Sequence, residues 1–181
     1  MTRITRRRAQ RGFTLIEAAL TTVIVGVGVL SIVAAQQAYH RQNQWAKRSG
    51  TGMLLANELR EVMATLPLRD PVTNANTIGP EENKPTQYDD VDDFTDAHIG
   101  AGTEGPSAQP MTGLGQRADS LANWSQKVQV EPVAHNDIAT PIENPRNADM
   151  ARVTVTVLYE GPKLDERSEE TVAQLSWIVT P

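Results

Sequence analysis

An uncharged apolar run near the N-terminus constrains the fold of this chain more than any other feature. From Ala18 to Ala35 the sequence is mostly valine, leucine, isoleucine and alanine, with no charged side chain. As a helix, residues 13–35 would extend roughly 35 Å, which is enough to cross a bilayer. Residues 1–12 contain five arginines and no acid, and such basic flanks stay in the cytoplasm. The sequence therefore predicts a single-pass membrane protein with its N-terminus inside and the rest of the chain outside.

A secretory signal peptide has the same basic start and apolar core. This alternative predicts a soluble secreted chain that begins near Ala38, because small residues follow the apolar run. Two features favour a retained helix instead: the run is longer than the usual signal core, and Glu17 lies inside it. A carboxylate at that depth costs about 3 kcal/mol unless it has a partner or stays near the interface, and a signal peptide has no use for one.

The residues Gly12-Phe13-Thr14-Leu15-Ile16-Glu17 resemble the N-terminal signature of type IV pilins and type II secretion pseudopilins. The resemblance covers Arg11 to Ala35. It implies cleavage between Gly12 and Phe13 by a prepilin peptidase, N-methylation of the new Phe13 amine, and a helix that remains as anchor and assembly element. It also implies that Glu17 pairs with the amine of a neighbouring subunit. Because an unpaired buried charge is costly, such a pair would permit one stagger between helices; the alternative leaves Glu17 among lipid headgroups.

The composition limits the remaining possibilities. With 181 residues, the chain has room for an anchor helix and one modest outer domain. It has no cysteine, which excludes a disulfide. The formal charge of −5 becomes more negative once the arginine-rich leader is removed, and aromatic residues are few. Nucleic acid is therefore not an expected partner, because phosphate contacts need clustered lysine and arginine.

Beyond the apolar run, the absence of proline up to Leu66 predicts that the helix continues. Gly50 and Gly52 are expected to bend or loosen it. An apolar stripe at helical spacing then predicts a face that packs on a sheet, formed by Leu55, Leu59, Val62, Met63 and Leu66. The predicted divisions are a cleaved leader at 1–12, a membrane and assembly half of the helix at 13–38, an outer amphipathic half at 39–66, and a head at 67–181.

The segment 71–115 reads as a long irregular loop with a strongly acidic centre. Its carboxylates are Asp89, Asp90, Asp92, Asp93 and Asp96. Oxygen ligands without histidine or cysteine suit Ca²⁺, although the spacing is not that of an EF-hand, and a solvated acidic loop is the alternative. The stretch from Tyr88 to Phe94 is also similar to minor pilin-like proteins of the PilV and MSHA biogenesis type.

Alternating β-branched and aromatic residues predict strands only in the C-terminal third, at about 124–133, 151–159 and 171–179. The stretch 134–149 reads as a loop. Together these elements predict an α+β fold in which a long N-terminal helix packs on a small antiparallel sheet, as the pilin resemblance also implies.

No motif of an enzyme occurs in the sequence, and the histidines at positions 40, 98 and 135 are scattered. The chain is therefore expected to be a structural subunit, a minor pilin or pseudopilin. It would sit in the inner membrane with its head outside before it enters a pilus or pseudopilus. Its partners would be other pilin subunits, the prepilin peptidase and membrane lipid. The alternative function is a membrane-anchored binding module that never polymerises and uses the acidic loop for a cation or ligand.

Overall fold

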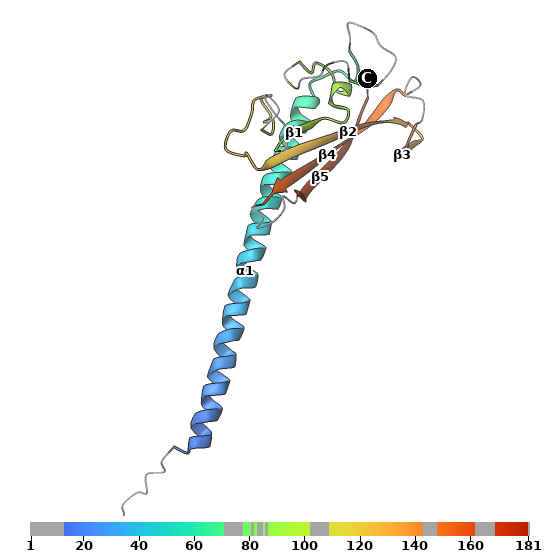
Figure 1. The fold of residues 1–181 in the computed structure, drawn as a ribbon. Coiled ribbons are helices and arrows are strands. Elements are labelled where there is room, and N and C mark those ends of the chain that lie inside the picture. The colour runs from blue at the N-terminus through green and yellow to red at the C-terminus, as the bar shows by residue number, and fades with distance from the viewer. Residues whose placement is uncertain are drawn as a thin grey trace, which may run out of the picture. The chain divides into compact units, whose positions relative to one another are not determined.

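A computed structural model shows one long helix and one antiparallel sheet (Figure 1). The structure describes residues 13–70, 78–80, 82, 85, 87–101, 109–142, 148–161 and 169–180. The chain divides into two compact units, Met1–Trp45 and Ala46–Pro181. The expected α+β class is confirmed, whereas the membrane boundary expected at residue 38 stays a prediction.

The helix α1 spans Leu15–Met63 without interruption. Two turn-like hydrogen bonds follow it, from Thr65 N–H to Val62 and from Leu66 N–H to Met63, before Pro67 prevents further helix. The helix thus ends three residues earlier than the sequence indicated. The expected bend or loosening at Gly50 and Gly52 is not observed.

The surroundings of Gly52 explain why a glycine occupies this position of the helix. It is buried, and a Cβ built on it would lie 2.9 Å from Cγ2 of Val172 and 3.1 Å from Cβ of Ala173. The missing side chain lets the helix and β5 (Glu169–Val179) approach closely. Gly50 has no atom within 4 Å of such a Cβ, so it has no comparable packing role.

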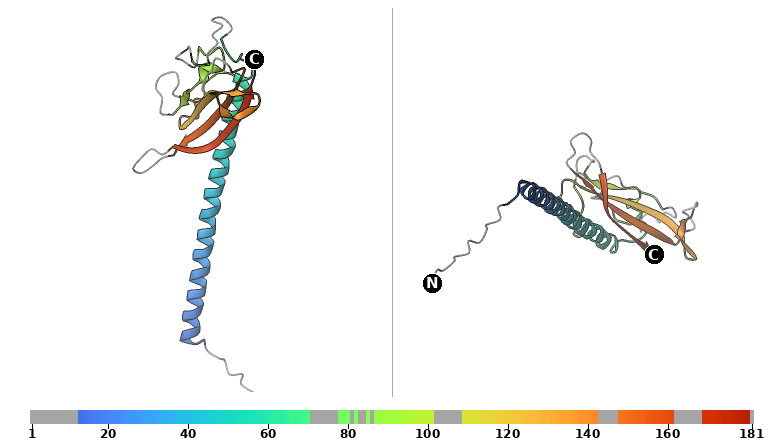
Figure 2. Two further views of the ribbon diagram at one scale, coloured as in Figure 1. Left: turned by 90° about the vertical axis from the view of Figure 1, so that its right-hand side faces the viewer. Right: turned by 90° about the horizontal axis from the view of Figure 1, so that it is seen from below.

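In the described part of the chain, the sheet has five antiparallel strands. β1 (His98–Gly100), β2 (Trp124–Ala134), β4 (Met150–Glu160) and β5 follow one another in that order, and β3 (Asp137–Pro141) lies beside β2. β2 (Trp124–Ala134) and β4 (Met150–Glu160) pair continuously from Trp124–Tyr159 to Val133–Met150. The alternation expected for these strands is confirmed, since Val128, Val153 and Val155 are buried. In β5, Ala173 is buried, and Leu175 and Trp177 pack against the core. Figure 2 shows the last turns of α1 against one face of the sheet. The expected stripe fills this interface, with Leu55, Leu59 and Met63 fully buried.

Two short strands differ from the expectation. β1 (His98–Gly100) lies inside the segment expected to be irregular, after a 3₁₀ turn, η1 (Asp92–Phe94). β3 (Asp137–Pro141) lies in the expected loop 134–149 and forms a hairpin with β2. The statement that strands occur only in the C-terminal third was therefore wrong for β1.

Candidate functional site

The expected cleavage point lies at the edge of the described structure. Gly12 and the rest of the basic leader fall outside the described residues. Phe13 is 67% exposed and precedes the helix by two residues. Its backbone lies outside α1, which begins at Leu15.

The first turn of α1 is closed by Thr14 and Glu17, which sequence reasoning did not connect. Glu17 N–H donates to Oγ1 of Thr14 at 3.3 Å, and this hydroxyl donates to Oε2 of Glu17 at 3.5 Å. A threonine followed three residues later by a glutamate is a sequence signal for such a cap. The arrangement also places the Glu17 carboxylate at the positive end of the helix dipole, four residues after Phe13.

The helix that follows presents apolar side chains to every side. Large apolar residues from Leu15 to Val33 are exposed, and the most apolar part of the helix has no buried residue. The hydroxyls of Thr21, Thr22 and Ser31 donate to carbonyls four residues earlier, so they bring no unsatisfied donor into an apolar environment. By length and composition, this helix can cross a membrane.

The acidic segment is not the solvated loop that was the alternative to a calcium site. Asp90, Asp92 and Asp93 are 0–1% exposed, whereas Asp89 and Asp96 are exposed. Backbone N–H groups explain the burial: Glu82 and Asp89 donate to the two oxygens of Asp93 at 3.3 and 3.1 Å, and Gly79 donates to Oδ2 of Asp92 at 3.0 Å. The buried carboxylates thereby hold the preceding loop.

Glu82 joins this cluster, although its position in the sequence gave no signal for it. One carboxylate oxygen from each of Glu82, Asp89 and Asp93 lies within 4.8 Å of the other two. A hydrogen bond with Asp93, burial, and the charges of Asp93, Asp89 and Asp90 raise the pKa of Glu82 to about 7. Burial also raises the pKa of Asp90, against the opposing effect of hydrogen bonds with the Asp92 side chain and the Asp93 backbone. Asp96 lies outside the trio, and the five expected ligands therefore do not converge as one set.

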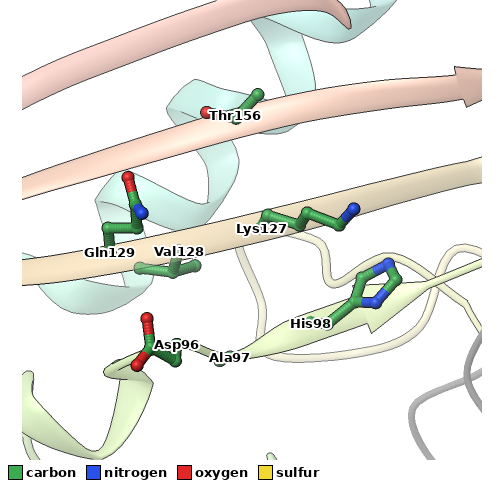
Figure 3. A pocket seen from close by; sticks show the side chains of 7 residues that line it. All are labelled: Asp96, Ala97, His98, Lys127, Val128, Gln129 and Thr156. Carbon is green, nitrogen blue, oxygen red and sulfur yellow. The ribbon is translucent and has the colours of Figure 1, made fainter. Parts of the chain in front are cut away.

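An open pocket of about 300 Å³ lies on the sheet beside β1, β2 and β4 (Figure 3). His98 and Lys127 are cross-strand neighbours in it, and Lys127 forms a 2.7 Å ion pair with Glu169. Burial, followed by the Lys127 charge, lowers the pKa of His98. Burial thus disfavours the charged form of the His98 imidazole, and Glu169 offsets the charge of Lys127.

A profile of the prokaryotic N-terminal methylation motif matches residues 7–33. Searches of curated proteins and of solved structures return no match. The motif match ends well before Tyr88, so the similarity to PilV and MSHA biogenesis proteins stays a prediction.

The methylation motif is the signature of type IV pilins and pseudopilins, which are structural subunits rather than enzymes. It coincides with the start of an exposed apolar helix long enough to span a membrane. Over these residues the chain carries the signature of type IV pilins and pseudopilins, and the signature leads into a helix that could cross a membrane by its length and composition.

Proposed function

We propose that this protein is a structural subunit of a type IV pilus or a type II secretion pseudopilus. A prepilin peptidase would cleave it between Gly12 and Phe13 and methylate the Phe13 amine. The subunit would then stay in the inner membrane, with its head outside, until it enters the filament. The proposal rests chiefly on the methylation motif leading into an apolar helix whose one acidic or basic side chain between Phe13 and Tyr39 is Glu17.

Helix packing explains how such a subunit could leave the membrane. In a bundle, exposed apolar side chains such as Leu20, Ile24 and Leu30 would contact neighbouring helices in place of lipid. Glu17 would then be buried without water. The methylated amine of an adjacent subunit would satisfy this carboxylate, and a helix shifted along its axis would leave both charges unpaired.

The same helix defines the expected partners: further pilin subunits, the peptidase and membrane lipid. No catalytic role is proposed. A nucleic-acid partner is not proposed either, because the chain carries a net charge of −5 with its basic leader still attached.

Replacement of Glu17 tests assembly. Glu17→Ala and Glu17→Gln should both remain in the membrane fraction and be lost from sheared filaments, because neither provides a charge for the amine. Glu17→Gln retains an oxygen that can accept the Thr14 hydroxyl, so its loss from filaments would point to the charge rather than to the helix cap. Glu61→Ala replaces an exposed glutamate later in α1 and should assemble normally.

Normal incorporation of both Glu17 variants would contradict the proposal and favour the membrane-anchored binding module. The convergence of Glu82, Asp89 and Asp93 is the observation that supports this second candidate.

The mature N-terminus tests processing independently. Mass spectrometry and N-terminal sequencing of the protein from its native membrane should give a chain that starts at methylated Phe13. A chain that starts near Ala38 would instead identify a secreted domain released by signal peptidase.

A further inference from the structure

One side of α1 leaves two large apolar side chains uncovered within the head. Met53 is 43% exposed and Leu54 is 58% exposed, although both come well after the apolar run that ends at Ala35. Leu55, about 100° further round the helix, is 1% exposed and packs in the core. Met53 and Leu54 therefore belong to the side of α1 that the core does not use, and they offer apolar surface that a partner could bury.

Charges of opposite sign flank this pair along the same side of the helix. Lys47 lies seven positions before Leu54 and Glu58 lies four positions after it, and both spacings return to one helix face. Lys47 is exposed and Glu58 is half-buried, and within the described ranges neither forms an ion pair. No acidic residue occurs between Glu17 and Glu58, so this side of the helix changes from basic to acidic along its length.

A second copy of this chain fits this pattern of charge. Two copies anchored in one membrane have parallel helices, and parallel helices at equal height would place like charges together. Lys47 of one copy meets Glu58 of the other when the helices are displaced by 11 residues, roughly 16 Å. Eleven residues make about three full turns, so the displaced helix presents the same side to its neighbour. The Lys47 methylenes would then lie along Leu54 of the other copy, with the ammonium group at Glu58.

Gly50 leaves room for such a contact between Lys47 and Leu54. It is exposed, and a Cβ built on it would have no atom within 4 Å, so nothing in the described part of its own subunit requires a glycine there. Glycine is unfavourable inside a helix, but it lets a second backbone approach closely. A neighbouring helix on this side would account for its presence.

We propose that the side of α1 from Lys47 to Glu58 binds the same side of a second copy that is displaced by roughly 16 Å along the helix. The contact combines the Lys47–Glu58 ion pair with burial of Met53 and Leu54. Each copy uses Lys47 toward one neighbour and Glu58 toward another, so the contact repeats along a filament instead of closing into a dimer. This inference rests on the proposed function and adds to it a contact within the heads.

Charge reversal in the full-length protein, in cells that assemble the filament, tests the ion pair. Lys47→Glu and Glu58→Lys should each lower recovery in sheared filaments at least about tenfold, because each places like charges together. The double variant Lys47→Glu/Glu58→Lys should restore recovery, since it reverses the pair without removing it. Arg60→Glu is the matched control: Arg60 is exposed, lies two positions after Glu58 on a different side of the helix, and should be dispensable for recovery.

Disulfide cross-linking tests the displacement, and the absence of cysteine from the chain gives a clear background. Gly50 and Glu61 are exposed and 11 positions apart, so they should meet in neighbouring copies. Gly50→Cys/Glu61→Cys should therefore give a ladder of covalent multimers in filaments. Either single variant, and the control pair Gly50→Cys/Arg60→Cys, should give none.

Three results would overturn this inference and leave the proposed function intact. They are normal recovery of Lys47→Glu, no recovery of the double charge variant, and filaments that contain Gly50→Cys/Glu61→Cys without a ladder. Cross-linked dimers alone count as the last result, because a two-fold pair closes on itself. Absence of the unchanged protein from filaments would instead contradict the proposed function.

Discussion

Gly50 and Gly52 in α1 differ in the space around them: a side chain at position 52 would crowd β5, whereas one at position 50 would meet no other atom. Alanine at position 52 would place its Cβ 2.9 Å from the Val172 side chain. We expect the crowding to cost about 1–3 kcal/mol, more than the gain of about 1 kcal/mol in helix propensity. Gly52→Ala should therefore lower the free energy of unfolding by up to about 2 kcal/mol in a urea titration in detergent.

Gly50→Ala is the matched control for this substitution. Nothing lies within 4 Å of its added Cβ, so only helix propensity changes and stability should rise by up to about 1 kcal/mol. Stabilisation by both alanines would show that the helix and β5 do not approach as closely as described.

Gln126 is a polar side chain at a buried position of β2. Its Oε1 accepts from Met111 N–H at 2.7 Å, and its Nε2 donates to the carbonyls of Leu55 and Met111 at 3.0 and 3.1 Å. Gln126→Leu would leave the Met111 N–H buried without an acceptor, which should cost about 1–3 kcal/mol in the same titration. Gln129→Leu, at an exposed position of the strand, should change stability by less than about 0.5 kcal/mol.

Residue-level chemistry was predictable where the signal is local in sequence. Glu17 follows from the motif, and the Leu55 stripe follows from helical spacing. The burial of Asp93 does not follow from the sequence. The N–H groups that hydrogen-bond its carboxylate come from the preceding loop, and only the fold brings that loop close to Asp93. Gly52 was expected to loosen the helix, because the residue that packs against it, Val172, is 120 residues away in the sequence.

Among the elements, the β2–β3 hairpin contains a carboxylate that accepts two backbone hydrogen bonds at its turn. Oδ1 of Asp137 accepts the N–H groups of Ala139 and Thr140, both at 3.1 Å. Hydrogen bonds with the Thr140 side chain and backbone, and then with Ala139, hold the pKa of Asp137 below its usual 3.8. A carboxyl with a lower pKa in the folded state stabilises that state above pH 3.8, and this contribution is lost as the pH falls through the folded pKa.

Acid titration of the hairpin tests this dependence. In Asp137→Asn, stability should fall less steeply below about pH 4 than in the unchanged protein, because no carboxylate remains to be protonated there. Hydrogen exchange of the Ala139 and Thr140 amides would report it directly. Identical acid profiles for the two proteins would contradict the role given to Asp137.

Long strands were predicted correctly from the sequence, whereas short ones were missed. β4 alternates valine and polar residues over many positions, which makes its period unmistakable. β1 has three residues, and β3 is exposed along its length, so neither shows a hydrophobic period. β1 is defined by its pairing with β2, a tertiary contact that a local pattern cannot reveal.

For the whole molecule, the core of the head requires only the last turns of α1. The buried residues of this helix begin at Gly52. A chain of residues 42–181 should therefore be soluble without detergent and unfold cooperatively, at the same temperature as the head of the full-length protein, by circular dichroism. A chain of residues 57–181 lacks Gly52, Leu55 and Ala56 and should not fold; cooperative unfolding of this shorter chain would contradict the account of the core.

The bond between Gln126 and the Leu55 carbonyl joins residues 71 positions apart, and β5, which covers Gly52, comes later still. Synthesis delivers these parts in order, so the helix emerges long before the strands that cover it. During this interval Leu55, Leu59 and Met63 are without their partners. The head is completed only when residues 169–179 arrive, so the chain is most exposed to aggregation and proteolysis in the interval before they do.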